Sequence, residues 1–232
     1  MITSKQNPSF KLMQKLKLKK YRDAHDLFLV YGAHLIEKAK EKDAVQEILT
    51  SHEEKEGTLI SLDLMKELNQ TETLFDSIAI CKKTNHPISS NKILMLDDVQ
   101  DPDNVGALIR SAAAFGFHHL VFSLKTADLY NEKVIRASKG SIFDVFVERK
   151  PLVESIVTLK KEGYQLVYAD AHKNGKPIAT DKLVLILGNE GQGINKEIKQ
   201  LCDTSVHIQT KQVESLNVSV AGGILMHQWR DL

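Results

Sequence analysis

The sequence lacks several features that would indicate a particular class of protein. It contains only two cysteines, Cys81 and Cys202, which lie far apart and form no Cys-x-x-Cys pair. We therefore expect free thiols in a reducing compartment. No apolar run approaches the roughly 20 residues that span a membrane, and the N-terminus lacks the apolar segment of a signal peptide. These absences predict a soluble, cytoplasmic protein.

Motifs for metals and common nucleotides are also missing. His118 and His119 have no nearby Cys or Asp pattern, so no metal site is predicted. The glycine-rich segment "LVLILGNEGQGI", 183–194, is not followed by Gly-Lys-Ser/Thr and does not fit Gly-x-Gly-x-x-Gly. Both the phosphate-binding P-loop and the dinucleotide fingerprint are therefore absent.

Acidic residues are missing from the first 22 positions, although the whole chain has a net charge of only +1. This basic segment suits a polyanion such as RNA. A solvated amphipathic helix explains the same pattern equally well. If the segment binds RNA, its candidate contacts include Lys5, Lys11, Lys15, Lys19 and Arg22.

Hydrophobic patterning predicts two α/β regions. In the first region, Phe10, Met13 and Leu16 recur at helical spacing within 8–22. A second helix is expected from Ala33, and strands are expected at 27–32, 44–50 and 76–83. The polar stretch "KKTNHPISSNK" then separates the regions. We assign an N-terminal domain to 1–85, a linker to 86–91 and a C-terminal domain to 92–232.

Strands and helices alternate regularly in the C-terminal domain. This alternation predicts a parallel sheet covered on both faces. Ligands of such sheets bind beyond the carboxyl ends of the strands. We expect strands at 92–99, 119–123, 165–170, 183–188 and 205–209, and helices from Val105 to Gly116 and at 131–141, 155–163, 195–202 and up to Trp229.

Three segments of this domain carry polar side chains next to predicted elements. "DPDNVGALIRSAAAFG", 101–116, contains Asn104 and Arg110 at the start of a helix. "LILGNEGQGI" places Glu190 between glycines after a buried strand. "VESLNVSVAGGIL", 213–225, joins a polar cluster to a helix that contains two adjacent glycines.

Each segment also has a purely structural interpretation. In this interpretation, Asp103 or Asn104 serves only as an N-cap, and so does Ser215 or Asn217. Arg110 is then an ordinary surface residue. The second segment is a plain strand–turn–helix connection.

Taken together, the three segments resemble the motifs of the SpoU, or TrmH, family of RNA ribose 2′-O-methyltransferases. They agree in sequence, order and spacing over 92–229. "FLVYGAHLIEKA", 28–39, and the basic segment before it resemble the substrate-binding domain that precedes the catalytic domain in many members. The resemblance therefore covers nearly the whole chain.

The resemblance implies an α/β fold with a C-terminal trefoil knot, bound S-adenosylmethionine and a homodimer built on the final helix. It assigns the catalytic positions to Asn104, Arg110, Glu190, Ser215 and Asn217. Arg110 would contact the target RNA. Arginine is a poor base at its ordinary pKa, so a phosphate oxygen of the RNA is an alternative proton acceptor. Cofactor contacts would come from Gly188, Asn189, Gly193, Ile208, Leu216 and Asn217.

One departure concerns the segment before the third motif. Many members have a proline and then a glycine there, whereas this chain has "HIQTKQ" with one residue fewer, so we expect the cofactor loop to differ locally around Ile208. Ribosomal RNA is the favoured substrate, and the N-terminal domain is the reason. Transfer RNA is the alternative substrate, and a non-catalytic ribosome-assembly factor is the alternative of a different class.

Overall fold

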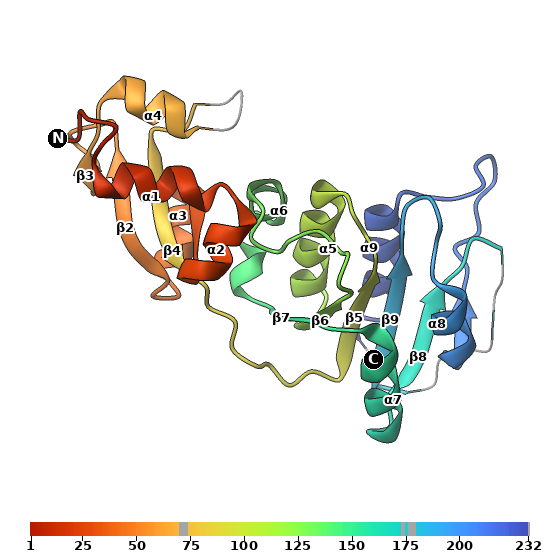
Figure 1. The fold of residues 1–232 in the computed structure, drawn as a ribbon. Helices are drawn as coiled ribbons and strands as arrows, with labels where there is room; N and C mark the ends of the chain where they lie inside the picture. Colours follow the sequence, from red (N-terminus) through yellow and green to blue (C-terminus); the bar gives the residue numbers. More distant parts are fainter. Residues whose placement is uncertain (70–73, 173–174, 176–179, 232) are drawn as a thin grey trace. The chain divides into compact units, whose positions relative to one another are not determined.

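The chain divides into two compact units in a computed structural model that describes residues 1–69, 74–172, 175 and 180–231 (Figure 1). The first unit contains Met1–Thr84 together with Asp128–Phe143. The second contains Asn85–Ala127 and Asp144–Leu232. The sequence analysis assigned Asp128–Phe143 to the C-terminal domain, because the predicted strands and helices alternate there without interruption.

A four-stranded sheet in the order β1-β4-β2-β3 forms the centre of the first unit. β1 and β2 pair antiparallel with β4, and β3 is parallel to β2. The strands are Leu27–Tyr31 (β1), Val45–Thr50 (β2), Thr58–Leu59 (β3) and Ser77–Lys82 (β4). The helices are Pro8–Leu16 (α1), Lys19–His25 (α2), Ala33–Lys40 (α3), Leu62–Leu68 (α4) and Glu132–Ser138 (α6), which is followed by the 3-10 helix Ser141–Phe143 (η1).

The basic N-terminal segment forms two helices rather than the single helix that its spacing predicted. α1 begins after Asn7, whose side-chain oxygen accepts hydrogen bonds from the backbone of Ser9 and Phe10. Its apolar stripe is buried as predicted. The helix ends at Leu16, and Leu18 has an extended backbone and is 55% exposed. The chain therefore changes direction before α2 begins.

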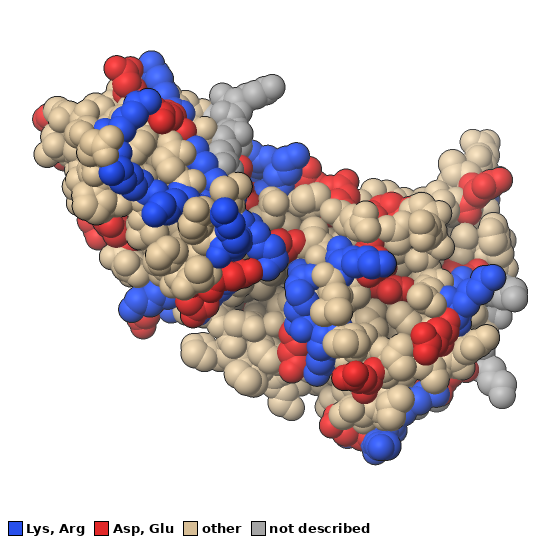
Figure 2. Space-filling model, viewed as in Figure 1, with Lys and Arg blue, Asp and Glu red and all other residues tan. Residues whose placement is uncertain are grey.

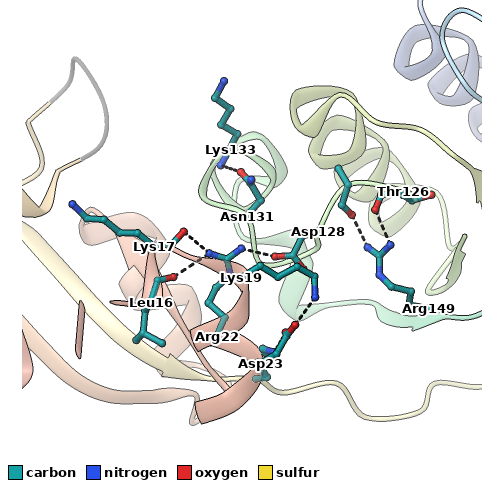
Figure 3. A network of polar contacts seen from close by, with 12 residues as sticks. Leu16, Lys17, Lys19, Arg22, Asp23, Thr126, Asp128, Asn131, Lys133 and Arg149 are labelled. Atoms are coloured by element: carbon teal, nitrogen blue, oxygen red, sulfur yellow. Dashed lines mark hydrogen bonds and ion pairs between the residues drawn. The ribbon is translucent and has the colours of Figure 1, made fainter. Parts of the chain in front are cut away.

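Arg22 holds this corner together. Its guanidinium donates hydrogen bonds to the carbonyl oxygens of Leu16, at 3.0 Å, and Lys17, at 2.8 Å, and pairs with Asp128 at 2.7 Å (Figure 3). The residue is only 6% exposed. This burial argues against its predicted contact with RNA, because its charge is paired with Asp128 inside the first unit.

The segment Asp128–Phe143 completes the first unit. The ring of Phe28, on β1, lies 4.7 Å from that of Tyr130 and 6.1 Å from that of Phe143. At Gly140 an added Cβ would approach the side chain of Lys38, on α3, to 3.0 Å. These contacts cover β1 with apolar groups, which explains why the segment belongs to this unit.

A six-stranded, all-parallel sheet in the order β10-β8-β9-β5-β6-β7 forms the second unit, as the alternating pattern predicted. The strands are Lys92–Asp97 (β5), His119–Phe122 (β6), Phe146–Arg149 (β7), Gln165–Ala169 (β8), Leu183–Gly188 (β9) and Thr204–Val206 (β10). The helices are Pro102–Ala114 (α5), Leu152–Lys161 (α7), Lys196–Leu201 (α8) and Val218–Gln228 (α9). The central strands β5 and β9 are almost wholly buried.

Alternate residues of β9 face opposite layers of the second unit. Val184 and Ile186 pack in one apolar cluster with Ile156, on α7. Leu187 points to the other face, toward α9. Because successive strand residues point to opposite sides, this arrangement requires apolar residues throughout β9.

Close packing explains why position 222, one of the two adjacent glycine positions in the final helix, is a glycine. A Cβ at this position would lie 2.4 Å from Cδ2 of Leu108, on α5, and 2.6 Å from Cδ1 of Leu187. Gly222 therefore lets α9 approach both α5 and the sheet. A Cβ at Gly223 would meet only Ser111 Oγ, at an ordinary 3.6 Å.

Both cysteines are free thiols, as predicted. Burial raises the pKa of each thiol to about 12, so neither is set up as a nucleophile. In the part of the chain that the structure describes, every helix is too short or too polar to cross a membrane.

Candidate active site

The carboxyl end of β9 leads into a tight turn that carries Glu190. Asn189 and Gly193 exchange two backbone hydrogen bonds, of 3.1 and 2.9 Å, and Gly193 has φ +68°. At Gly188 an added Cβ would lie 2.5 Å from the backbone of Gly193. Glycine is thus required at 188 by close approach of the chain to itself. The glycines fix a compact turn that projects Glu190.

A chain of hydrogen bonds joins the three motifs. The Asn104 side-chain amide donates to Glu190 Oε1 at 3.1 Å. Its oxygen accepts from the Asn217 side-chain amide at 3.0 Å. Asn104 is only 8% exposed, so its amide is held with both partners satisfied. Three segments far apart in sequence therefore meet through one side chain.

At α5 the residue that caps the helix takes no part in these hydrogen bonds, whereas at α9 the capping residue also belongs to them. Asp101, rather than Asp103 or Asn104, caps α5 by accepting from the backbone of Asp103 at 2.9 Å. That helix consequently starts at Pro102, earlier than predicted, and the Asn104 amide is free to reach Glu190. Asn217 caps α9 with its oxygen and uses its nitrogen for Asn104.

Glu190 is held as a carboxylate. Partial burial acts to raise its pKa, but hydrogen bonds from its own backbone, the Asn104 amide and the backbone of Asp101 and Gln100 outweigh this effect, so the pKa is lowered. The two backbone donors lie 3.3 and 3.4 Å from its oxygens. Sequence reasoning missed Gln100 and Asp101 as partners, because their contribution comes from the main chain. The "QDPDN" turn was the available signal.

A cavity of about 520 Å³ opens beside the turn. The six residues that the resemblance assigned to cofactor binding all line this cavity: Gly188, Asn189, Gly193, Ile208, Leu216 and Asn217. Glu190 and Ser215 line it as well. Its volume lies within the range of about 300–1,000 Å³ that small-molecule sites occupy. Asn104 does not line the cavity but supports its rim through Glu190 and Asn217.

The lining suits an adenosine-containing cofactor. Apolar side chains of Leu187, Ile194 and Val206 supply surface for an aromatic base. The backbone groups of Ile208 and Leu216 have no hydrogen-bond partner among the residues that the structure describes. Unpaired backbone groups in a cavity require a partner, and a nucleoside supplies both donors and acceptors.

Arg110 stands outside this network. It is exposed on α5, and within the described part of the chain it has no hydrogen-bond or ion-pair partner. Six residues turn a helix through about 600°, so Arg110 lies about 120° away from Asn104 around α5. The sequence-based expectation that both side chains face one cleft is not reproduced in the isolated chain.

The remaining basic candidates lie on the surface of the first unit, where Figure 2 shows lysines over α1 and α2. Lys5 pairs with Glu67 at 2.5 Å, and Lys19 pairs with Asp23. Lys15 lies over the ring of Tyr21. Such exposed pairs contribute about 0–1 kcal/mol and can exchange for phosphate. Among the described residues, no three His, Cys, Asp or Glu side chains gather in a metal-binding arrangement.

Comparison with known proteins identifies the family. A family model described as the SpoU rRNA Methylase family matches residues 91–227. The chain belongs to the SpoU rRNA methylase family. A second model, the MRM3-like substrate binding domain, matches residues 7–88. SpoU methylases transfer a methyl group from S-adenosylmethionine to RNA, so the predicted enzyme class and cofactor are confirmed.

Relatives of this SpoU methylase match it along its whole length. The 23S rRNA (guanosine(2553)-2′-O)-methyltransferase RlmP of Bacillus subtilis is 35% identical over 99% of this chain and 98% of its own. The crystal structure of the SpoU methyltransferase AviRb from Streptomyces viridochromogenes, in complex with AdoMet, matches with a TM-score of 0.81 at 25% identity over 97% of each chain. A putative TrmH-family RNA methyltransferase structure from Porphyromonas gingivalis gives 0.86 at 26% identity over 99% and 98%.

Proposed function

We propose that this protein methylates a ribose 2′-hydroxyl in 23S ribosomal RNA, with a guanosine as the target nucleotide. The single observation that carries the reaction is the Glu190–Asn104–Asn217 chain at the rim of the 520 Å³ cavity. It unites the three motifs beside the space for the methyl donor. The choice of RNA is supported by the full-length likeness to RlmP, which acts on guanosine in 23S rRNA, and by the match to the substrate-binding domain.

The cofactor would lie in the 520 Å³ cavity, against the backbone of Ile208 and Leu216 and the glycine turn at Gly188–Gly193. S-adenosylmethionine supplies an electrophilic methyl group on a positively charged sulfonium. Glu190, kept charged by its hydrogen bonds, adds negative potential where such a cation is held.

A ribose hydroxyl is a weak nucleophile and has to be positioned and relieved of its proton. Ser215 and Glu190 both line the cavity, and the Ser215 hydroxyl would orient the ribose. Arg110 would hold the neighbouring RNA phosphate by a charge-assisted hydrogen bond. With Arg110 bound to that phosphate, a phosphate oxygen would lie near the hydroxyl and accept its proton. The guanidinium would then not have to act as a base.

The exposed lysines of the first unit would bind the RNA body. Their charges act on any phosphate backbone, so they add affinity without sequence preference. Arg22 is left out of this surface because it is buried. The protein would carry out this work in the cytoplasm.

A homodimer built on α9 belongs to the same proposal. Val220 and Ile224, on α9, are 50% and 43% exposed. They follow one another at helical spacing and form an apolar strip that a second copy would cover. We also propose the trefoil knot, which is supported by the return of the chain from β10, at the edge of the sheet, to α9 against α5 and β9.

The function is tested with purified protein, methyl-labelled S-adenosylmethionine and total RNA from a strain that lacks the gene. Ribose-methylation sequencing should place the label at one guanosine of 23S rRNA. Label in transfer RNA would support the alternative substrate. Retained cofactor binding with no label in naked RNA or in precursor ribosomal particles would contradict the proposal and favour a non-catalytic assembly factor.

A further inference from the structure

A second cavity lies at the same edge of the parallel sheet. Its volume is about 540 Å³. It shares Asn189, Gly193 and Ile194 with the cofactor cavity, so the turn that carries Glu190 separates the two spaces. None of the predicted site residues except Asn189 and Gly193 contributes to it.

Hydrogen bonds fix the inner wall of this cavity. Asp97 Oδ2 accepts from the backbone of Asn195 at 2.8 Å. Asp98 Oδ1 accepts from Ser123 Oγ at 2.6 Å, and the Asp98 carbonyl accepts from the Asn189 amide at 2.8 Å. The cavity is therefore preformed, and its wall is acidic.

The loop that carries Lys125 is also held firmly. Arg149 donates to the carbonyl oxygens of Ser123 at 2.8 Å, Thr126 at 2.7 Å and Ala127 at 2.7 Å (Figure 3). One guanidinium thus organises the connection after β6. Lys125 projects from this loop with its Nζ 3.6 Å from Asp98.

The outer wall offers polar groups that the protein leaves unused. Among the described residues, the side-chain amides of Gln100 and Gln192 and the ammonium of Lys196 have no hydrogen-bond or ion-pair partner. All three residues are exposed. An amide donates and accepts at once, which matches the edge of a nucleobase, whereas an ammonium matches a phosphate.

Gln100 connects this cavity to the reacting groups. Its backbone N–H donates to Glu190 Oε2 at 3.4 Å, and the residue also lines the second cavity. A ligand held by Gln100 therefore lies next to the carboxylate at the rim of the cofactor cavity. The acidic inner wall disfavours an anion there, so a phosphate would stay at the lysines and a neutral group would enter.

We propose that this cavity receives the base of an unpaired nucleotide that neighbours the methylated one in the RNA. The amides of Gln100 and Gln192 contact the edge of the base, and Lys125 and Lys196 contact its phosphate. The inference rests on the proposed ribose methylation and extends it to sequence selection, because the neighbouring base is read beside the target ribose.

Three single variants test the inference: Gln100→Ala, Gln192→Ala and Lys196→Ala. Matched controls are Gln200→Ala, on α8, and Lys161→Ala, on α7, which change the same residue types at exposed positions outside both cavities. Each protein is assayed with protein-free ribosomal RNA from the strain that lacks the gene. The readouts are kcat and KM for RNA, the Kd for S-adenosylmethionine and the position of the label.

The cavity variants should lose about tenfold in kcat/KM, mainly through KM, which is the scale of one base-edge contact. Their Kd for S-adenosylmethionine should stay at the wild-type value. Label at secondary positions should rise for Gln100→Ala and Gln192→Ala, which lose a base contact, but not for Lys196→Ala, which loses only a phosphate contact. Cavity variants that match the controls would overturn this inference alone, and so would variants that lose cofactor affinity in proportion to activity. A wild-type protein that labels no ribose, either in protein-free RNA or in precursor ribosomal particles, would overturn the proposed function and this inference together.

Discussion

The side chain of Asn104 is hydrogen-bonded on both sides, to Glu190 at 3.1 Å and to Asn217 at 3.0 Å. One amide therefore fixes the orientation of a carboxylate on the β9 turn and of the residue that caps α9. Its burial means that neither partner is replaced easily by water. Everything proposed for the reaction depends on this alignment.

Replacing Asn104 should damage activity and stability together. Asn104→Ala removes the two hydrogen bonds that this buried amide makes to Glu190 and Asn217, which costs about 1–3 kcal/mol in total, and releases Glu190 from its position. We expect methyl transfer to fall at least tenfold and the urea midpoint to drop. Asp103→Asn is the matched control, since Asp103 is exposed on the same helix turn. An Asn104→Ala protein with wild-type turnover would contradict the alignment role.

Arg110 should affect transfer without affecting the cofactor. It is exposed, and it does not line the cofactor cavity. We expect Arg110→Ala to lower kcat roughly 100-fold or more, while calorimetry shows an unchanged Kd for S-adenosylmethionine. Unchanged turnover would remove Arg110 from the mechanism.

The two glycines of α9 should respond differently to alanine. Gly222→Ala drives a methyl group to within 2.4 Å of Leu108, and such overpacking costs typically about 1–3 kcal/mol. Gly223→Ala meets only ordinary contacts and gains helix propensity worth up to about 1 kcal/mol. Denaturant unfolding of the two variants measures the difference. Equal stability would show that α9 does not need the close approach at Gly222.

Asp128 should matter far more than its exposed counterpart in the same unit. Asp128→Ala strands the buried guanidinium of Arg22, which costs about 3–5 kcal/mol. Asp23→Ala removes exposed ion pairs worth about 1 kcal/mol or less. Replacing both partners, with Arg22→Met and Asp128→Leu, should restore most of the loss. If the double variant is as unstable as Asp128→Ala, the penalty does not come from the unpaired charge.

The lowered pKa of Glu190 predicts that the protein loses stability in acid. Its pKa in the folded protein is lowered, so the charged form favours folding. This contribution is complete above the ordinary pKa of glutamate and disappears as the pH falls through the lowered pKa of the folded state. The free energy of unfolding of the wild type, minus that of Glu190→Gln, should therefore shrink between pH 6 and pH 3. A difference that is constant with pH would contradict the assigned shift.

The sequence predicted much of the second unit because its signals are local. An uninterrupted apolar run such as Leu183–Leu187 indicates a strand buried on both faces, and the parallel order follows from the alternation. The residues that the three motifs predicted for cofactor binding line a single cavity, even though Ile208 lies in a segment that departs from the family pattern.

Other features depended on contacts that no local pattern encodes. Arg22 lies in a basic segment and looked like an RNA contact, but its partner, Asp128, is 106 residues away. The same long-range packing moves Asp128–Phe143 into the first unit. Gln100 was missed because its backbone, rather than its residue type, binds Glu190.

The most direct test of ribose methylation uses the chemistry of the product. Alkali cleaves RNA through the free 2′-hydroxyl, so a methyl group on that oxygen leaves the next phosphodiester bond intact. After reaction with labelled S-adenosylmethionine, the ribosomal RNA is hydrolysed in alkali and separated by size. The account predicts that the label appears in alkali-resistant dinucleotides. Label released entirely as mononucleotides would place the methyl group on a base and contradict the account.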